Sequence, residues 1–380
     1  MALTNIQKQV RMVFDLNKCL GCQTCTSACK TQWTDRNQGQ QYMYWNNVET
    51  QPGRGYPKYY DMMGGGWDVK NPTYASGLTE PLSALRFNSP LPKVNESYGA
   101  PWEYNYDQVL KTSGGTPTKT QVVPSPDPSG ANAYGMNWDE DVATGNYPNA
   151  YYFYLPRICN HCTTPACLAA CPRKAIYKRQ EDGIVLVDQN RCRGFRYCVK
   201  GCPYKKTYFN HLENKSQKCI FCYPRRTDSL EATDPQPQLA PTFQSNFCFT
   251  QCVGRIRFVG FSGNPAANVN KLIDTWRVAL RLHPEWGTEP NLYYIPPLSP
   301  PGGGTSTEAL GTQNRIPVDV LASMFGDDHL QTHAQRVARI EEIFATLASE
   351  RAKVAAGGGS ELIAILTAHS EADRLQLHLG

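Results

Sequence analysis

The chain has 380 residues, a net charge of +5 and 19% charged residues. This length predicts two or three domains, or one domain with large insertions. The positive charge is spread along the chain without a run of five or six basic residues, so nothing favours nucleic-acid binding. No apolar stretch approaches about eighteen residues, so we expect no membrane span.

The first part of the chain predicts one short strand followed by long irregular segments. Residues 9–18 alternate in polarity around Met12 and Phe14, which favours a strand leading into the first cysteines. Residues 31–60 are aromatic and irregular. Residues 61–150 contain no cysteine and many glycines and prolines, which indicates an insertion built of loops. The tryptophans and tyrosines of this insertion favour an ordered wrap.

The second part predicts more regular elements. Apolar residues at 176–177 and 184–187 flank a turn and predict a β-hairpin, and residues 255–260 predict a closing strand. Residues 334–353 repeat apolar side chains at helical spacing. After three glycines, Ser360 is placed to cap a second helix. We expect that helix to carry Leu362, Ile363, Leu366 and Leu375.

All fifteen cysteines fall into four groups. The first group has the C-x2-C-x2-C-x3-C spacing of bacterial ferredoxins, whose thiolates hold iron–sulfur clusters. Proline directly follows the last cysteine of the second and third groups, as in the same run. The groups are Cys19, Cys22, Cys25 and Cys29; Cys159, Cys162, Cys167 and Cys171; Cys192, Cys198 and Cys202; and Cys219, Cys222, Cys248 and Cys252.

Disulfides and zinc are the competing interpretations of these cysteines. Full pairing into disulfides would leave one thiol over, because fifteen is odd, and a chain of this length can bury a core without covalent links. Zinc sites use two separated C-x2-C pairs, a pattern that the fourth group alone could match. Three or four cysteines within a dozen residues, repeated along the chain, favour iron–sulfur clusters instead.

The ferredoxin rule divides the cysteines among four clusters. The fourth cysteine of each run ligates the neighbouring cluster, so the two middle groups pair with each other and the outer groups pair across the long gap. Phe195 stands where the third group would place a ligand, and three remaining thiolates fit a three-iron cluster of raised potential. The predicted ligands are Cys19, Cys22, Cys25 and Cys252 for cluster 1; Cys29, Cys219, Cys222 and Cys248 for cluster 2; Cys159, Cys162, Cys167 and Cys202 for cluster 3, each of these being [4Fe-4S]; and Cys171, Cys192 and Cys198 for the [3Fe-4S] cluster, so that iron is the metal at every site.

These patterns predict an α+β fold of two ferredoxin-like modules of the bacterial two-cluster type, with long loop insertions and a C-terminal helical extension. The first module comprises residues 1–60 and 205–300 with the outer cysteine groups, and the second comprises residues 151–204. Residues 61–150 form the loop-rich insertion. Residues 301–380 form a tail with two helices that we expect to bind a partner.

Five segments give this chain a resemblance to a known family. It resembles the iron–sulfur beta subunits of the nitrate reductase, ethylbenzene dehydrogenase, dimethylsulfide dehydrogenase and nitrite oxidoreductase group, within the dimethyl sulfoxide reductase (molybdopterin) family. The resemblance covers residues 10–60 and 150–300 and is weaker elsewhere. Nitrate reductase subunits usually carry tryptophan at the Phe195 position. The segments are Cys19–Cys25, Trp45–Thr50, Cys192–Cys198, Gly201–Lys206 and Tyr293–Pro297.

The resemblance implies an electron-transfer subunit in anaerobic respiration. It implies a catalytic partner with a molybdenum bis-pterin cofactor and a third subunit with haem b, and this chain supplies no catalytic residue of its own. The substrate is not encoded here; the first loop and the size favour a hydrocarbon or sterol hydroxylating dehydrogenase or a nitrite oxidoreductase. A stand-alone polyferredoxin carrier is the alternative.

The same resemblance bears on where the protein works. The first ten residues are polar and contain neither an apolar signal core nor a twin-arginine pair. We therefore expect the chain to fold in the cytoplasm and to reach the periplasm by co-export with a partner subunit. A cytoplasmic location is the alternative.

Six further residues near the cysteines invite a specific role. For His161 we favour a hydrogen bond to sulfide or backbone over metal ligation. Lys205, Lys206, Arg225 and Arg226 have two interpretations. They form a solvated basic face, or their charges tune the potentials of the anionic clusters. For Trp33 we favour a role in shielding a cluster over a role in relaying electrons.

Overall fold

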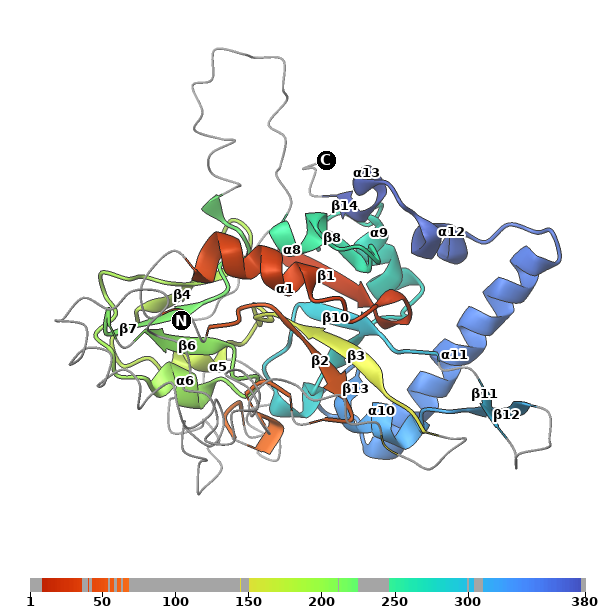
Figure 1. Ribbon diagram of the computed structural model, residues 1–380, viewed down its shortest axis with the longest axis horizontal. Coiled ribbons are helices and arrows are strands. Elements are labelled where there is room, and N and C mark those ends of the chain that lie inside the picture. The colour runs from red at the N-terminus through yellow and green to blue at the C-terminus, as the bar shows by residue number, and fades with distance from the viewer. Residues whose placement is uncertain are drawn as a thin grey trace, which may run out of the picture.

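A computed structural model describes most of the cysteine-bearing segments and the tail (Figure 1). The described residues are 9–35, 40, 43–53, 55–57, 60–62, 64–67, 144, 150–210, 212–224, 246–298, 301–303 and 310–376. The insertion predicted at 61–150 therefore lies almost wholly outside the described residues. Within those ranges, no helix is long and apolar enough to cross a membrane.

A six-stranded mixed sheet forms the centre of the fold (Figure 1). Its strand β1 pairs parallel with β10 on one side and antiparallel with β8 on the other. Met12 thus lies opposite Leu292 in one neighbour and Val259 in the other, and all three side chains are buried. The order across the sheet is β13 (Phe325–Gly326), β9 (Leu280–Leu282), β10 (Leu292–Ile295), β1 (Val10–Asp15), β8 (Arg257–Phe261) and β14 (Leu375–Gln376).

The strands expected at 9–18 and 255–260 are confirmed as β1 and β8. Their burial differs from the alternation that we expected. Val13 and Asp15 are buried as well as Met12 and Phe14. Both faces of the sheet are therefore covered along β1, where every residue except Arg11 is buried.

A smaller block of two hairpins carries the middle cysteine groups and lies at the left of Figure 1. The expected hairpin is confirmed: β4 (Ile176–Lys178) pairs with β5 (Val185–Val187). β6 (Thr207–Asn210) pairs with β7 (Lys215–Lys218) in the second hairpin. Because β5 contacts β7, the second hairpin packs against the first. The second module that we predicted ends at residue 204, before this second hairpin begins.

An antiparallel strand pair connects the aromatic segment to the middle block. β2 (Asn47–Gln51) runs against β3 (Phe153–Arg157), and every residue of β2 is buried. Glu49 of β2 and Arg157 of β3 form an ion pair of 2.8 Å, and both side chains are almost wholly inaccessible to solvent. The pair therefore fixes the two strands to each other inside the protein.

The tail contains the two helices that its sequence predicts. Thr332 caps α11 (His333–Ala355) in a capping box with Gln335, and Ser360 accepts a hydrogen bond from the backbone N–H of Ile363 in α12 (Glu361–Thr367). Leu375 belongs to β14 and not to this helix, because α12 ends earlier than we expected. The other described elements beyond the cysteine segments are η1 (Leu16–Lys18), η3 (Tyr60–Met62), α9 (Asn268–Asn270), η5 (Lys271–Thr275), η6 (Pro284–Trp286), β11 (Pro301–Gly303), β12 (Leu310–Asn314), α10 (Val318–Met324) and α13 (Glu371–Arg374).

The apolar face of the tail packs on this chain. Leu321, Ile340 and Leu362 are buried in the same hydrophobic cluster as the central sheet. The tail also supplies both outer strands of the sheet, β13 and β14, and thus pairs edges that would otherwise be open. That the tail binds a partner stays a prediction, but its apolar stripe is already used within the chain.

Candidate iron–sulfur sites

Four short helices position most of the cysteines in pairs one turn apart. In an α-helix, residues i and i+4 lie on the same face, one above the other. α1 therefore presents two thiols at successive positions along its axis, and α5, α6 and α8 each carry one cysteine and are followed by a second, four residues further along the chain. The helices with their cysteines are α1 (Thr24–Cys29) with Cys25 and Cys29, α5 (Ala166–Ala169) with Cys167 and the following Cys171, α6 (Tyr197–Gly201) with Cys198 and the following Cys202, and α8 (Phe247–Thr250) with Cys248 and the following Cys252.

These helices pack in two pairs. α1 contacts α8, and α5 contacts α6. In Figure 1, α1 and α8 lie beside β1 and β8 of the central sheet, whereas α5 and α6 lie in the block of hairpins. The pair of α1 and α8 thus brings together cysteine groups that are far apart in sequence. The pair of α5 and α6 brings together groups that are adjacent in sequence.

The cysteines predicted for cluster 1 line one small cavity. Cys19 and Cys22 come from the turn between η1 and α1, Cys25 lies at the start of α1, and Cys252 comes from the segment before β8. Burial raises the pKa of Cys19 to about 11. Burial would also raise the pKa of Cys25, but the Arg257 guanidinium, together with hydrogen bonds from Asn46 and Thr26, outweighs burial and the pKa is lowered. One member of this set is therefore held closer to its thiolate form.

The cysteines predicted for cluster 2 lie around the C-terminal end of α1. Burial raises the pKa of Cys29 well above its ordinary value, and the thiolates of Cys219, Cys248 and Cys222 raise it further. These three cysteines are the ones that the sequence spacing predicts as ligands of the same cluster as Cys29. The structure thus brings the set together from α1, α8 and the turn after β7.

The cysteines predicted for cluster 3 line a second small cavity. Cys159, Cys162, Cys167 and Cys202 face it, together with the buried side chain of His161. Burial raises the pKa of Cys162, and the neighbouring thiolates of Cys159 and Cys202 add to that effect. A neutral thiol is therefore favoured there until a cation binds.

The three cysteines predicted for the three-iron cluster also lie together. Burial raises the pKa of Cys198 to about 12; a hydrogen bond with Ser216 lowers it, and the thiolates of Cys171 and Cys192 raise it. Phe195, in the loop between Cys192 and Cys198, is 57% exposed. The position that would carry a fourth ligand therefore holds an apolar side chain turned partly towards solvent.

The residues present fit iron–sulfur clusters. None of the fifteen cysteines, all of which are described, takes part in a disulfide. Two of the four sets of thiols line small cavities, and thiolate is the ligand that such clusters use. Within the described residues, no three His, Cys, Asp or Glu side chains converge as they would on a single metal ion.

Two predicted basic residues are not solvated. Lys205 and Lys206 are 2% and 1% exposed, so the interpretation as a solvated basic face is wrong for them. Lys205 Nζ donates to the backbone oxygens of Gly64 and Lys200, and Lys206 Nζ donates to Asn47 Oδ1. Burial lowers the pKa of Lys205 to about 8, and the Cys202 thiolate opposes that shift.

Arg225 and Arg226 lie outside the described residues. The competing hypothesis for all four basic residues, that they tune the cluster charge, stays a prediction.

Two aromatic residues contact the sites as hydrogen-bonding groups. His161 accepts a hydrogen bond from the backbone N–H of Val185 at its Nδ1 atom, at 3.0 Å, which agrees with the expected bond to backbone. Trp33, in the π-helical turn η2 (Lys30–Thr34), donates from Nε1 to the sulfur of Cys222 at 3.2 Å. Trp33 therefore donates a hydrogen bond to a predicted ligand of cluster 2, and its role in shielding that cluster stays a prediction.

Sequence reasoning missed two fully buried cations beside the cysteines. Arg257 donates to the backbone oxygen of Cys248 at 2.6 Å and to Asn46 Oδ1 at 3.3 Å. Lys218 Nζ donates to the backbone oxygens of Val185 and Cys219. The signal in the sequence was weak: both residues lie within strands next to cysteine groups, where a charged residue ordinarily faces solvent.

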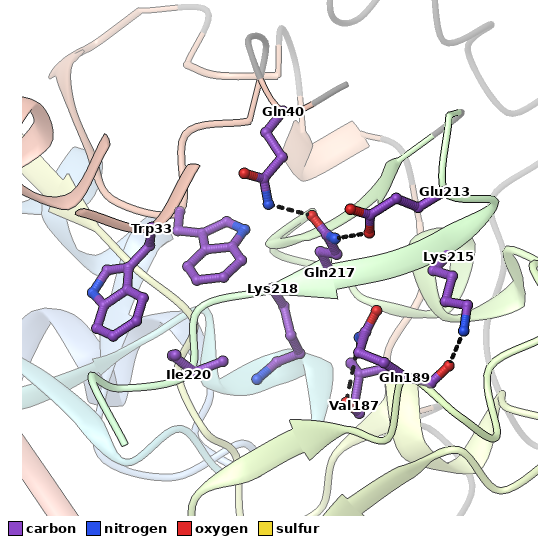
Figure 2. Close-up of a pocket in the computed structure, with 10 residues that line it drawn as sticks. Trp33, Gln40, Val187, Gln189, Glu213, Lys215, Gln217, Lys218 and Ile220 are labelled. Carbon is purple, nitrogen blue, oxygen red and sulfur yellow. Dashed lines mark hydrogen bonds between the residues drawn. The ribbon is translucent and has the colours of Figure 1, made fainter. Parts of the chain in front are cut away.

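A larger cavity of about 570 Å³ contains no cysteine. Figure 2 shows Trp33 on one side of it and the β6–β7 hairpin on the other. Gln40 donates to Gln217 at 2.7 Å, and Gln217 donates to Glu213 at 2.7 Å, which closes the polar wall. Among these described side chains, no nucleophile lies beside a base, which is the arrangement that nucleophilic catalysis uses.

The sites and the fold around them define an iron–sulfur electron-transfer protein. Residues 150–261 match the 4Fe-4S dicluster domain family, in agreement with the ferredoxin-like part of our prediction and with the mixed α and β content. The chain belongs to the iron–sulfur beta subunits of the dimethyl sulfoxide reductase family of molybdenum enzymes. Its function as an electron-transfer subunit is thereby confirmed.

Three relatives illustrate this membership. The chain is 47% identical to the beta subunit of dimethylsulfide dehydrogenase from Rhodovulum sulfidophilum, over 98% of this chain and 99% of that protein. It is 46% identical to the selenate reductase beta subunit of Thauera selenatis, over 97% and 98%. It is also 46% identical to the respiratory nitrate reductase beta subunit of Haloferax mediterranei, over 98% and 95%.

Proposed function

We propose that this chain conducts electrons through four clusters, in the order cluster 1, cluster 2, cluster 3 and the three-iron cluster. The observation that carries the proposal is the pairing of cysteines on the four helices. Cys25 and Cys29, both on α1, belong to clusters 1 and 2. Cys198 on α6 and Cys202, directly after α6, belong to the three-iron cluster and cluster 3. Each helix therefore joins two successive clusters, one turn apart.

Contacts between the sets support this order. Cys25 of cluster 1 and Cys248 of cluster 2 pack against each other in one small apolar cluster. The Cys159 thiolate of cluster 3 is close enough to Cys219 of cluster 2 to raise its pKa, after the larger effect of burial. The junction between the two helix pairs therefore lies at clusters 2 and 3, and the two ends of the path are cluster 1 and the three-iron cluster.

The same arrangement supports two ferredoxin-like modules. The helices α1 and α8 hold the outer cysteine groups, and the helices α5 and α6 hold the middle groups. Each module contributes two clusters, as in two-cluster ferredoxins. We propose three [4Fe-4S] clusters and one [3Fe-4S] cluster on the ligand sets given above, since the third group has only three cysteines.

We further propose a catalytic molybdenum bis-pterin subunit at one end of this path and a haem b subunit or another acceptor at the other. The relatives named above are each beta subunits, which supports permanent assembly over the alternative of a stand-alone polyferredoxin. Those relatives belong to enzymes named for dimethylsulfide, selenate and nitrate, so they do not support our preference for hydrocarbon, sterol or nitrite substrates. We propose the periplasm, reached with a partner's signal, as the working compartment.

The test is purification of the native complex without added tags on the partner. Metal analysis should give about fifteen irons per copy of this chain beyond those of the partners, because three four-iron clusters and one three-iron cluster sum to fifteen. A large molybdenum-containing subunit should co-purify. Substantial zinc, an iron count near eight, or a chain that purifies alone with all its iron would contradict the proposal.

A further inference from the structure

Arg257, in the middle of the protein, is a buried cation that has no carboxylate partner among the described residues. Its side chain on β8 is 0% exposed. Its hydrogen-bond acceptors include the Cys248 carbonyl oxygen and Asn46 Oδ1, which are both neutral. Its Nε atom has no hydrogen-bond partner, and no Asp or Glu in the described part of the chain forms an ion pair with it.

Such a charge needs compensation. Removing an ion from water costs several kcal/mol even after relaxation, about the scale at which single changes unfold proteins. Arginine cannot avoid this cost by losing its proton. Arg157, which is equally buried, is compensated by Glu49 at 2.8 Å. Arg257 therefore requires anions of another kind.

The anions that the structure places around Arg257 are sulfurs. Arg257 lines the small cavity of cluster 1 together with Cys25 and Cys252, and it donates to the backbone oxygen of Cys248 at 2.6 Å. Cys25 and Cys252 belong to the set of cluster 1, and Cys248 belongs to the set of cluster 2. One guanidinium thus lies between two successive sets of thiolates.

We infer that Arg257 is the shared counter-charge of clusters 1 and 2, raising the reduction potential of both. Net charge and hydrogen bonds around the sulfurs set the potential of a cluster, so a fixed cation between two clusters favours the added electron on either one. It also offsets the repulsion between electrons on neighbouring clusters. This inference rests on the ligand sets proposed above.

Arg257→Gln tests the inference by removing the charge. The measurement is a redox titration of the intact complex followed by electron paramagnetic resonance, which reports each cluster separately. The midpoint potentials of clusters 1 and 2 should both fall, and those of cluster 3 and the three-iron cluster should stay. Arg257→Lys, which keeps the charge, should retain most of the potential of both.

Asn46→Asp is a second variant that leaves the guanidinium in place. The Oδ1 atom of residue 46 already lies 3.3 Å from Arg257, so the new carboxylate should cancel its charge with little change of shape. The potentials of clusters 1 and 2 should again fall together. Lys218→Met is the matched control, because the thiolates around Lys218 are those of Cys159, Cys167 and Cys219; it should leave cluster 1 unchanged.

The outcomes separate the inference from the proposed function. Unchanged potentials of clusters 1 and 2 in Arg257→Gln with full iron, or an equal fall in Arg257→Lys, would overturn the inference alone. If Arg257→Gln loses iron, Asn46→Asp decides: lowered potentials of both clusters support the inference, and unchanged potentials or a fall at one cluster only overturns it. Too little iron in the unmodified complex would instead overturn the proposed clusters.

Discussion

Replacing Glu49 by glutamine should destabilise the protein through the charge that it leaves behind. Glu49 neutralises Arg157 at 2.8 Å, and both side chains are shielded from solvent. Arg157 also donates to the carbonyl oxygens of Tyr56 at 2.7 Å and Tyr204 at 3.0 Å, and its guanidinium lies 3.4 Å from the centre of the Tyr60 ring. These contacts hold the arginine in place, so it cannot turn to solvent when its partner becomes neutral.

The expected loss of stability follows from the burial of this ion pair. Breaking a buried ion pair by removing one partner costs about 3–5 kcal/mol. Unfolding entropy of about 2.1 cal/mol/K per residue gives roughly 0.8 kcal/mol/K for a chain of this length, so the melting temperature should fall by about 4–6 °C. Bleaching of the visible cluster absorption reports the transition, at one scan rate for every variant because unfolding with cluster loss is irreversible.

The control is an ion pair at the surface. Arg11 lies 2.6 Å from Asp274, whose side chain is 54% exposed, so Asp274→Asn should cost less than about 1 kcal/mol. Combining Glu49→Leu with Arg157→Met should recover much of the loss, since an apolar pair leaves no buried charge. A melting temperature of Glu49→Gln equal to that of Asp274→Asn would refute the reasoning.

Three further predictions concern the clusters and the tail. Phe195→Cys should convert the three-iron cluster to a four-iron cluster and lower its potential, so the paramagnetic signal of the oxidised three-iron cluster should disappear; persistence of that signal would show that the third group is aligned wrongly. Trp33→Phe should lower the potential of cluster 2 alone, because it removes the 3.2 Å hydrogen bond to the Cys222 sulfur; an unchanged potential would leave shielding as its role. Leu362→Ala should destabilise the isolated chain by about 2–5 kcal/mol, because the side chain is fully buried on this chain; unchanged melting with weakened co-purification of a partner would instead assign that leucine to an interface.

The local elements could be predicted because their signals are local. The hairpin of β4 and β5 follows from two short apolar runs around a glycine turn, where a Cβ at Gly183 would come within 2.1 Å of the Gln9 side chain. The helices α11 and α12 follow from apolar spacing and from the capping residues Thr332 and Ser360. The cysteine sets follow from spacing alone, and the structure places each set together, although the ligand assignment itself stays a prediction.

The long-range parts could not be predicted from spacing. The register that places Met12 between Leu292 and Val259 joins segments about 250 residues or more apart in the chain. Asn46 and Asn47 show the same limit. Both are buried and accept hydrogen bonds from Arg257 and Lys206, and these cations come from segments far along the chain that the sequence does not place beside them.

The buried cations follow from the same long-range packing. A sequence in which every group of thiols binds an anionic cluster accumulates negative charge in its interior, and carboxylates cannot balance it. Arg257 and Lys218 each lie against thiolates of two successive sets, one between clusters 1 and 2 and the other between clusters 2 and 3. The positions of charge therefore follow the proposed path of the electrons, and loss of either cation should be felt at two neighbouring clusters and not along the whole chain.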